Sequence, residues 1–260
     1  MRLCSIVSVV VAGWLMSFAG VARGADGEAE AAVWKTAYVK RTFMGDMRAS
    51  WAGGGEATLR MRTPLVVGGS KAKVYVQGSF ENRIELVRMA LVRGADDEGK
   101  SQGDSFAVTF DGKRELALNA KANGRASDVI DVPAVAGTWY VDDVYAGPVV
   151  PYAYEVDHGW WKGADGNGGK LNVRTGLVRR VDVLTTDRRP LVACFGDSIT
   201  AGLGSTPNAG RRYTDVLAKL ADRPVLNLGT NGDTMAANGA AWNAIGGLAG
   251  VEVAVILLGT

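Results

Sequence analysis

Three short polar blocks near the C-terminus hold the residues best suited to chemistry, and each follows an apolar run. The first block is Gly196-Asp-Ser-Ile-Thr200, directly after the apolar run 191–195. The second block is 229–234 and the third is 257–260. A serine hydroxyl held at the end of a buried strand becomes a nucleophile when an adjacent base takes its proton. Ser198 is therefore a candidate nucleophile.

Each of these residues also has a structural interpretation. Ser198 is a suitable helix N-cap after a strand, and Asp197 suits a hydrogen-bond acceptor that fixes the loop. Gly232-Asp233 is an ordinary turn pair. The pair Gly202-x-Gly204 resembles part of a dinucleotide-binding loop, but Pro207 replaces its third glycine and no phosphate-binding Gly-Lys-Ser/Thr follows. The first block also lacks the second glycine of the α/β-hydrolase elbow.

The region around the blocks alternates between expected strands and expected helices. Residues 191–195, 224–228 and 251–258 are short apolar runs typical of buried parallel strands. Residues 211–221 have an amphipathic helical pattern, and the Ala-rich segment 235–248 predicts a second helix that several glycines weaken. This alternation predicts a parallel sheet covered by helices. The blocks then lie together, because ligands bind at the carboxyl ends of such strands.

The preceding region, from about Trp34 to Leu184, has a different pattern. Apolar and polar residues alternate in several short runs separated by Gly-rich turn clusters, which predicts an antiparallel β-sandwich of jelly-roll type. The pattern changes near Arg188-Arg-Pro190. We therefore expect three parts: a signal peptide at 1–24, an accessory β-sandwich domain at 30–187, and an α/β domain at 188–260.

The three blocks together resemble the signature of SGNH/GDSL-type serine esterases. The resemblance covers about residues 190–260. It implies Ser198 as nucleophile, and the backbone N–H groups of Ser198 and Gly232 as oxyanion-hole donors. It also implies a flavodoxin-like three-layer α/β/α fold, no metal or organic cofactor, and an accessory β domain like that of some bacterial members. The family's oxyanion-hole Asn would follow Thr260, and its Asp-x-x-His block would lie still later. We therefore expect the 260-residue chain to be a truncated product with weak or no activity.

The resemblance implies hydrolysis of an ester through an acyl-serine intermediate. The expected partner is an acylated carbohydrate, a lipid or a small ester, and a β domain combined with export favours an acylated polysaccharide. An alternative function is a non-catalytic glycan-binding envelope protein with a vestigial hydrolase portion, and a third is a purely structural envelope protein. The formal net charge of +2 and the lack of a concentrated basic segment argue against nucleic acid as a partner.

The N-terminus has the pattern of a bacterial export signal. Arg2 precedes an apolar run at 5–19, which is short for a bilayer span, and small residues follow at 20–24. We therefore expect a secreted or periplasmic protein with no stable membrane span after cleavage. Cys4 would leave with the signal, so Cys194 would be unpaired, and its apolar neighbours indicate a buried small hydrophobe.

Other residues that often carry chemistry are few in this sequence. His158 is the one histidine, and it is expected to be a surface or packing residue. No His, Cys and carboxylate cluster has metal-ligand spacing. The pair Trp160-Trp161, with Tyr152 and Tyr154 nearby, has the composition of a sugar-binding platform, although packing in the core or between domains is the expected role.

Overall fold

The computed structural model describes most of the chain between residues 31 and 258. The described residues are 31–40, 45–48, 56–78, 83–94, 100–119, 124–134, 136–146, 149–153, 159–163, 165, 167–171, 174–234 and 247–258. The expected signal peptide, His158 and most of the expected helix 235–248 lie outside them. Within 247–248 the chain is not helical.

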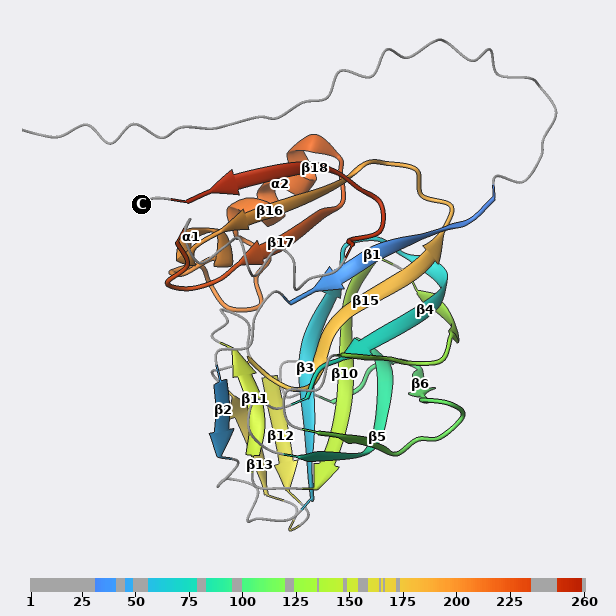
Figure 1. Cartoon of the computed structure of the whole chain (residues 1–260). Coiled ribbons are helices and arrows are strands. Elements are labelled where there is room, and N and C mark those ends of the chain that lie inside the picture. Colours follow the sequence, from blue (N-terminus) through green and yellow to red (C-terminus); the bar gives the residue numbers. More distant parts are fainter. Residues whose placement is uncertain are drawn as a thin grey trace, which may run out of the picture.

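Two antiparallel sheets make up most of the β region (Figure 1). The first sheet contains β1 (Val33–Val39), β15 (Val178–Thr185), β4 (Gly69–Val76), β8 (Arg125–Ala126) and β9 (Ile130–Ala134). The second contains β13 (Gly168–Leu171), β12 (Gly159–Gly163), β3 (Glu56–Leu65), β10 (Gly137–Ala146), β5 (Ile84–Arg93), β6 (Ser105–Val108) and β7 (Leu116–Leu118). A smaller sheet joins β14 (Arg174–Thr175), β11 (Val149–Ala153) and β2 (Gly45–Arg48).

The two large sheets pack face to face over one hydrophobic core. Val74 on β4 and Val183 on β15 belong to the same buried cluster as Leu59 on β3, Leu91 on β5 and Val141 on β10. Alternate residues along each strand enter this core, as the period of two requires. The predicted sandwich arrangement thus has the shared core that two packed sheets need, and the predicted runs at 57–62, 73–77, 86–92 and 178–184 are strands.

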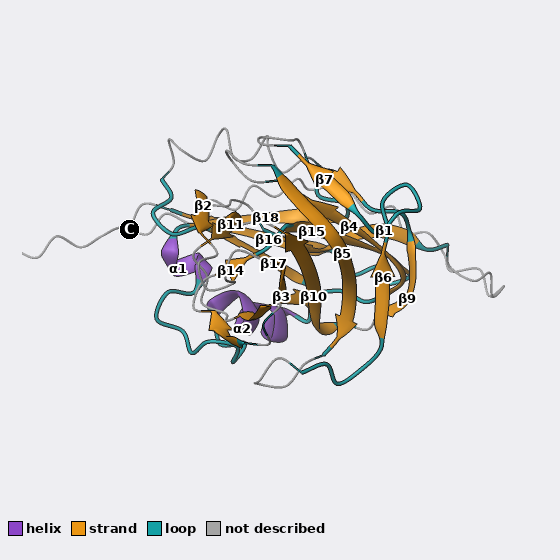
Figure 2. Cartoon of the chain, turned by 90° about the horizontal axis from the view of Figure 1, so that it is seen from below, coloured by secondary structure: helices purple, strands orange, loops and turns teal. Residues whose placement is uncertain are grey.

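The parallel strands follow directly after β15. They are β16 (Leu191–Gly196), β17 (Val225–Gly229) and β18 (Val251–Leu257), and β16 lies between the other two. The helices are α1 (Ser198–Ala201) and α2 (Tyr213–Ala221), and both lie on the side of the molecule away from β6 and β9 (Figure 2). The predicted three strands and the helix at 211–221 are confirmed, although the helix begins two residues later.

The central strand β16 is buried on both faces. Val192 and Cys194 lie in one cluster with residues of α2. Leu191, Ala193 and Phe195 face the other way, in a cluster with Val39 and Val66 of the β region. In the part of the chain that the structure describes, one face of this sheet is therefore covered by α2 and the other by β-region side chains. A flavodoxin-like helical layer on that second face remains a prediction.

Hydrogen bonds of backbone and side-chain groups also join β1 to the segments that precede β16 and β18. Thr36 on β1 donates its N–H to the carbonyl of Ala249 at 2.9 Å, and its hydroxyl accepts the Ala249 N–H at 3.0 Å. Lys35 donates its ammonium to the Arg189 carbonyl at 2.8 Å. The start of β18 is thus held against β1. None of the helices in the described part is both long and apolar enough to cross a lipid bilayer.

Candidate functional site

The candidate nucleophile lies where the central strand ends. β16 finishes at Gly196, Asp197 follows, and Ser198 is the first residue of α1. Ser198 is partly exposed, and no hydrogen bond of its hydroxyl occurs among the residues that the structure describes. The hydroxyl therefore has partial access to solvent and does not serve as the cap of α1.

Asp197, and not Ser198, is the N-cap of α1. Its carboxylate oxygen Oδ1 accepts the Ile199 N–H at 2.9 Å, and its carbonyl accepts the Ala201 N–H at 3.0 Å. The interpretation of Ser198 as an N-cap is therefore wrong, because the residue before it already satisfies the helix start. The interpretation of Asp197 as the acceptor that fixes the loop is confirmed.

Replacing Asp197 by alanine should loosen the turn that carries Ser198. The Ile199 N–H would lose its acceptor, and loss of a cap typically costs about 1 kcal/mol. We expect a lower free energy of unfolding in denaturant titrations of Asp197→Ala. Asp197→Asn keeps a side-chain oxygen in the same place and should stay much closer to the parent; equal losses in both variants would contradict the cap assignment.

Glycines let the strand ends and α1 approach each other closely. A Cβ on Gly196 would overlap the Thr200 side chain and would lie 2.5 Å from the Leu257 carbonyl oxygen. A Cβ on Gly229 would overlap the backbone of Thr200 and Ala201. The two glycines are register partners at the ends of β16 and β17. Glycine is therefore required here for close packing of α1 against the sheet.

The second block forms a turn directly after β17. The Thr230 N–H bonds to the Gly196 carbonyl at 3.0 Å, and the Asp233 N–H bonds to the Thr230 carbonyl at 3.2 Å. Gly232 is exposed and has a φ of 74°, in the left-handed region that favours glycine. The structure thus places the blocks containing Ser198 and Gly232 at adjacent strand ends. The third block ends outside the described residues, at 259–260.

Asn227 is a positioning residue to which the sequence did not direct attention. Its amide donates to the Thr200 carbonyl at 2.7 Å and to the Thr214 hydroxyl at 2.9 Å, while its oxygen accepts the Gly229 N–H at 2.9 Å. One side chain therefore ties together α1, α2 and the end of β17. The available signal was a single amide within the otherwise apolar run 225–228.

Burial disfavours ionisation of two groups on β16 and α2, the buried Cys194 thiol and the half-buried Tyr213 hydroxyl. Burial raises the pKa of the Tyr213 hydroxyl to about 12 and that of the Cys194 thiol to about 11. The Tyr213 hydroxyl lies 3.1 Å from the Thr200 hydroxyl. Cys194 has no exposed surface, so its predicted role as a buried small hydrophobe is confirmed.

Cys194 should resist thiol reagents while the protein is folded. In a Cys4→Ser background, we expect almost no reaction with a chromogenic disulfide at mildly alkaline pH and complete reaction in denaturant, because only the exposed thiolate reacts. The folded state favours the neutral thiol. Stability should therefore fall as pH rises from the ordinary thiol pKa of 9.0 toward about 11. Rapid reaction of the native protein would contradict the burial.

The described residues contain no group of three or more His, Cys, Asp or Glu side chains placed to hold a metal ion. A base for Ser198 is likewise not found among them, and His158 lies outside them. The roles of Ser198 and Gly232 remain predictions, and the structure adds that their blocks lie at adjacent strand ends.

Residues 192–253 match the model of the family described as GDSL-like lipase/acylhydrolase. These residues, a minor part of the chain, are therefore similar to that family. The matched GDSL-like segment contains β16, both helices, β17 and the first block with Ser198. The resemblance inferred from the three blocks is thus confirmed at the level of the family.

Some solved structures also match the chain, at low identity and low TM-score. A family two carbohydrate esterase from Cellvibrio japonicus is 12% identical, with 78% of this chain and 53% of that chain covered and a TM-score of 0.21. An acetyl xylan esterase from Butyrivibrio proteoclasticus is 10% identical, with 80% and 48% covered and a TM-score of 0.21. The chain spans about half the length of these proteins. No curated protein matches the sequence significantly.

Proposed function

We propose that the protein is a serine hydrolase of ester bonds, in which Ser198 attacks the ester carbonyl. The observation that carries the proposal is the position of the Ser198 hydroxyl. It is partly exposed, it is unbonded among the described side chains, and it follows the central parallel strand of a GDSL-like segment.

The chemistry follows the general course of acyl transfer. The Ser198 oxygen bonds to the carbonyl carbon, the alcohol leaves with a proton, and water then releases the acyl group as a carboxylic acid. The backbone N–H groups of Ser198 and Gly232 are the proposed donors to the developing oxyanion, and each such donor contributes about 3–4 kcal/mol. Glycine suits this role because a substrate can approach its N–H closely.

The proposed substrates are acylated carbohydrates, lipids or small esters, and an acylated polysaccharide is favoured. Export to the periplasm or the exterior is part of the proposal and is supported by the pattern of residues 1–24. The alternative of a non-catalytic glycan-binding protein predicts no hydrolysis of any ester.

Hydrolysis by the complete gene product tests this function. We expect release of acetate from an acetylated polysaccharide and of p-nitrophenol from its acetyl ester, both dependent on Ser198. The ratio between short-chain and long-chain esters then decides between a carbohydrate and a lipid substrate. Absence of turnover on every ester class would favour the glycan-binding alternative.

A further inference from the structure

The outer face of the second large sheet carries a row of side chains from four strands. Lys170 on β13 pairs with Trp160 on β12, Trp160 pairs with Arg60 on β3, and Arg60 pairs with Asp142 on β10. Directly opposite residues share one face of a sheet. The next row on that face contains Gly168, Lys162 and Thr58.

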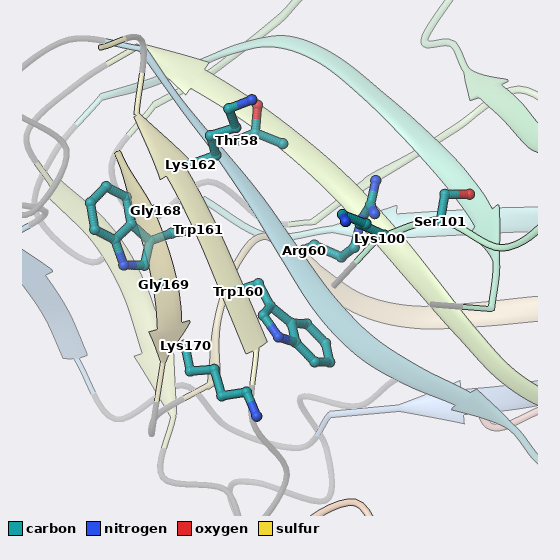
Figure 3. A pocket seen from close by; sticks show the side chains of 10 residues that line it. All are labelled: Thr58, Arg60, Lys100, Ser101, Trp160, Trp161, Lys162, Gly168, Gly169 and Lys170. Carbon is teal, nitrogen blue, oxygen red and sulfur yellow. The ribbon is translucent and has the colours of Figure 1, made fainter. Parts of the chain in front are cut away.

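A cavity of about 850 Å³ lies over these rows. Figure 3 shows the side chains around it, with the Trp160 indole between Lys170 and Arg60. Lys100 and Ser101 complete the lining from another segment of the chain. A cavity of this size lies within the range of ligand sites in proteins.

Basic side chains line the cavity. Lys100, Lys162 and Lys170 are exposed and line it together with Arg60. The guanidinium of Arg60 is held by the Asp142 carboxylate, with bonds of 2.5 and 2.6 Å, so this pair is fixed and close to neutral. The exposed ammonium groups of Lys162 and Lys170 therefore place positive charge at the cavity.

Gly168 and Gly169 on β13 line the cavity and lie close against β12. A Cβ on Gly168 would lie 2.6 Å from the Trp161 carbonyl oxygen, and one on Gly169 would lie 3.4 Å from the indole nitrogen of Trp161. Both glycines are exposed. The two glycines have no side chains, so the Trp161 indole borders the cavity beside them. Hydroxyl-bearing ligands suit such a lining, since it combines indole groups with hydrogen-bonding side chains.

A second hollow continues the same face. It has a volume of about 350 Å³, shares Thr58 with the first, and is lined by the exposed cations Arg88 and Arg114. Positive charge therefore extends across the sheet beyond one cavity, as an elongated ligand requires.

We propose that this face binds an anionic sugar chain, with one acidic sugar seated in the cavity beside Lys162 and Lys170. The shared chemistry is a carboxylate or sulfate group on a hydroxyl-rich ring. The site is separate from Ser198, because β12 and β13 lie at the end of the molecule away from α1 (Figure 1). The proposal does not rest on esterase activity, and its test measures binding alone.

A nucleic acid is disfavoured by the arrangement of the cations and aromatic rings. Single-stranded nucleic acids stack their bases on exposed aromatic faces along a basic groove. Trp160 is only 6% exposed, so it offers little ring surface on which a base could stack. The three lysines surround one cavity and do not follow a backbone path.

Calorimetric titration of the full chain with an oligogalacturonate, a sulfated oligosaccharide and neutral xylohexaose tests the proposal. We expect at least one acidic oligosaccharide to bind roughly tenfold or more tightly than the neutral one, with affinity falling as salt rises. The acidic sugar that binds better identifies the anionic group. Equal affinity for the neutral sugar, no binding of either acidic sugar, or tighter binding of a single-stranded oligonucleotide would overturn the proposal.

The double variant Lys162→Glu/Lys170→Glu locates the site. Both side chains are exposed, so the fold should persist, and affinity should fall roughly tenfold or more through like-charge repulsion. Lys219→Glu makes the same kind of charge reversal at an exposed position of α2, and this variant should bind like the parent. Unchanged affinity in the folded double variant would overturn the site. If that variant fails to fold, the affinities of the parent protein for the acidic and neutral sugars decide whether the proposal holds.

Discussion

Replacing Ser198 by alanine should abolish ester hydrolysis by the complete gene product. We expect a loss of roughly 10³-fold or more in kcat, because the attacking oxygen is removed and only oxyanion donors and binding remain. The measurement is release of p-nitrophenol from the acetyl ester under saturating substrate. Activity within a few-fold of the parent would contradict the assignment of the nucleophile.

The Ser198→Ala variant should keep the fold and the stability of the parent protein. The Ser198 hydroxyl makes no hydrogen bond among the described residues, and Asp197 already caps α1. We therefore expect an unchanged melting temperature, so that a loss of rate reports chemistry alone. Ser205→Ala, in the loop that follows α1, is the matched control and should retain full activity.

Gly229→Ala should produce the largest loss of stability among the changes considered. The added methyl would overlap the backbone of Thr200 and Ala201, and backbone atoms cannot rotate away as a flexible side chain does. We expect a loss of about 2–4 kcal/mol in the free energy of unfolding, measured by denaturant titration. Activity should fall as well, because α1 carries Ser198.

Gly247→Ala is the control for that variant. A Cβ at Gly247 would meet nothing within 4 Å, and the substitution should leave stability unchanged. Equal effects of the two substitutions would show that the close approach of α1 to β17 does not matter for the fold.

The parallel strands were predictable because burial on both faces leaves a simple pattern. Residues 191–195 are apolar throughout, since α2 covers one face and Val39 with Val66 covers the other. The sequence could not show which residues cover the second face of β16, because Val39 and Val66 are far from it in the sequence. The helix at 211–221 showed its amphipathic period, but its first residue depended on Arg212 and Asp215.

The cationic cavity could not be predicted from composition. The net charge is only +2, and the sequence shows no basic run. Arg60, Lys100 and Lys170 come together only through strand register and a loop. Trp160 and Trp161 do pack as expected, one buried and one against the core, yet both also line the cavity.

The central claim is that Ser198 is the nucleophile of an esterase. Labelling the complete gene product with a fluorophosphonate, followed by peptide mass spectrometry, tests it most directly. We predict a single adduct on Ser198, with ester hydrolysis lost in step with labelling. An adduct on another residue, or hydrolysis that persists after Ser198 is fully labelled, would contradict the claim.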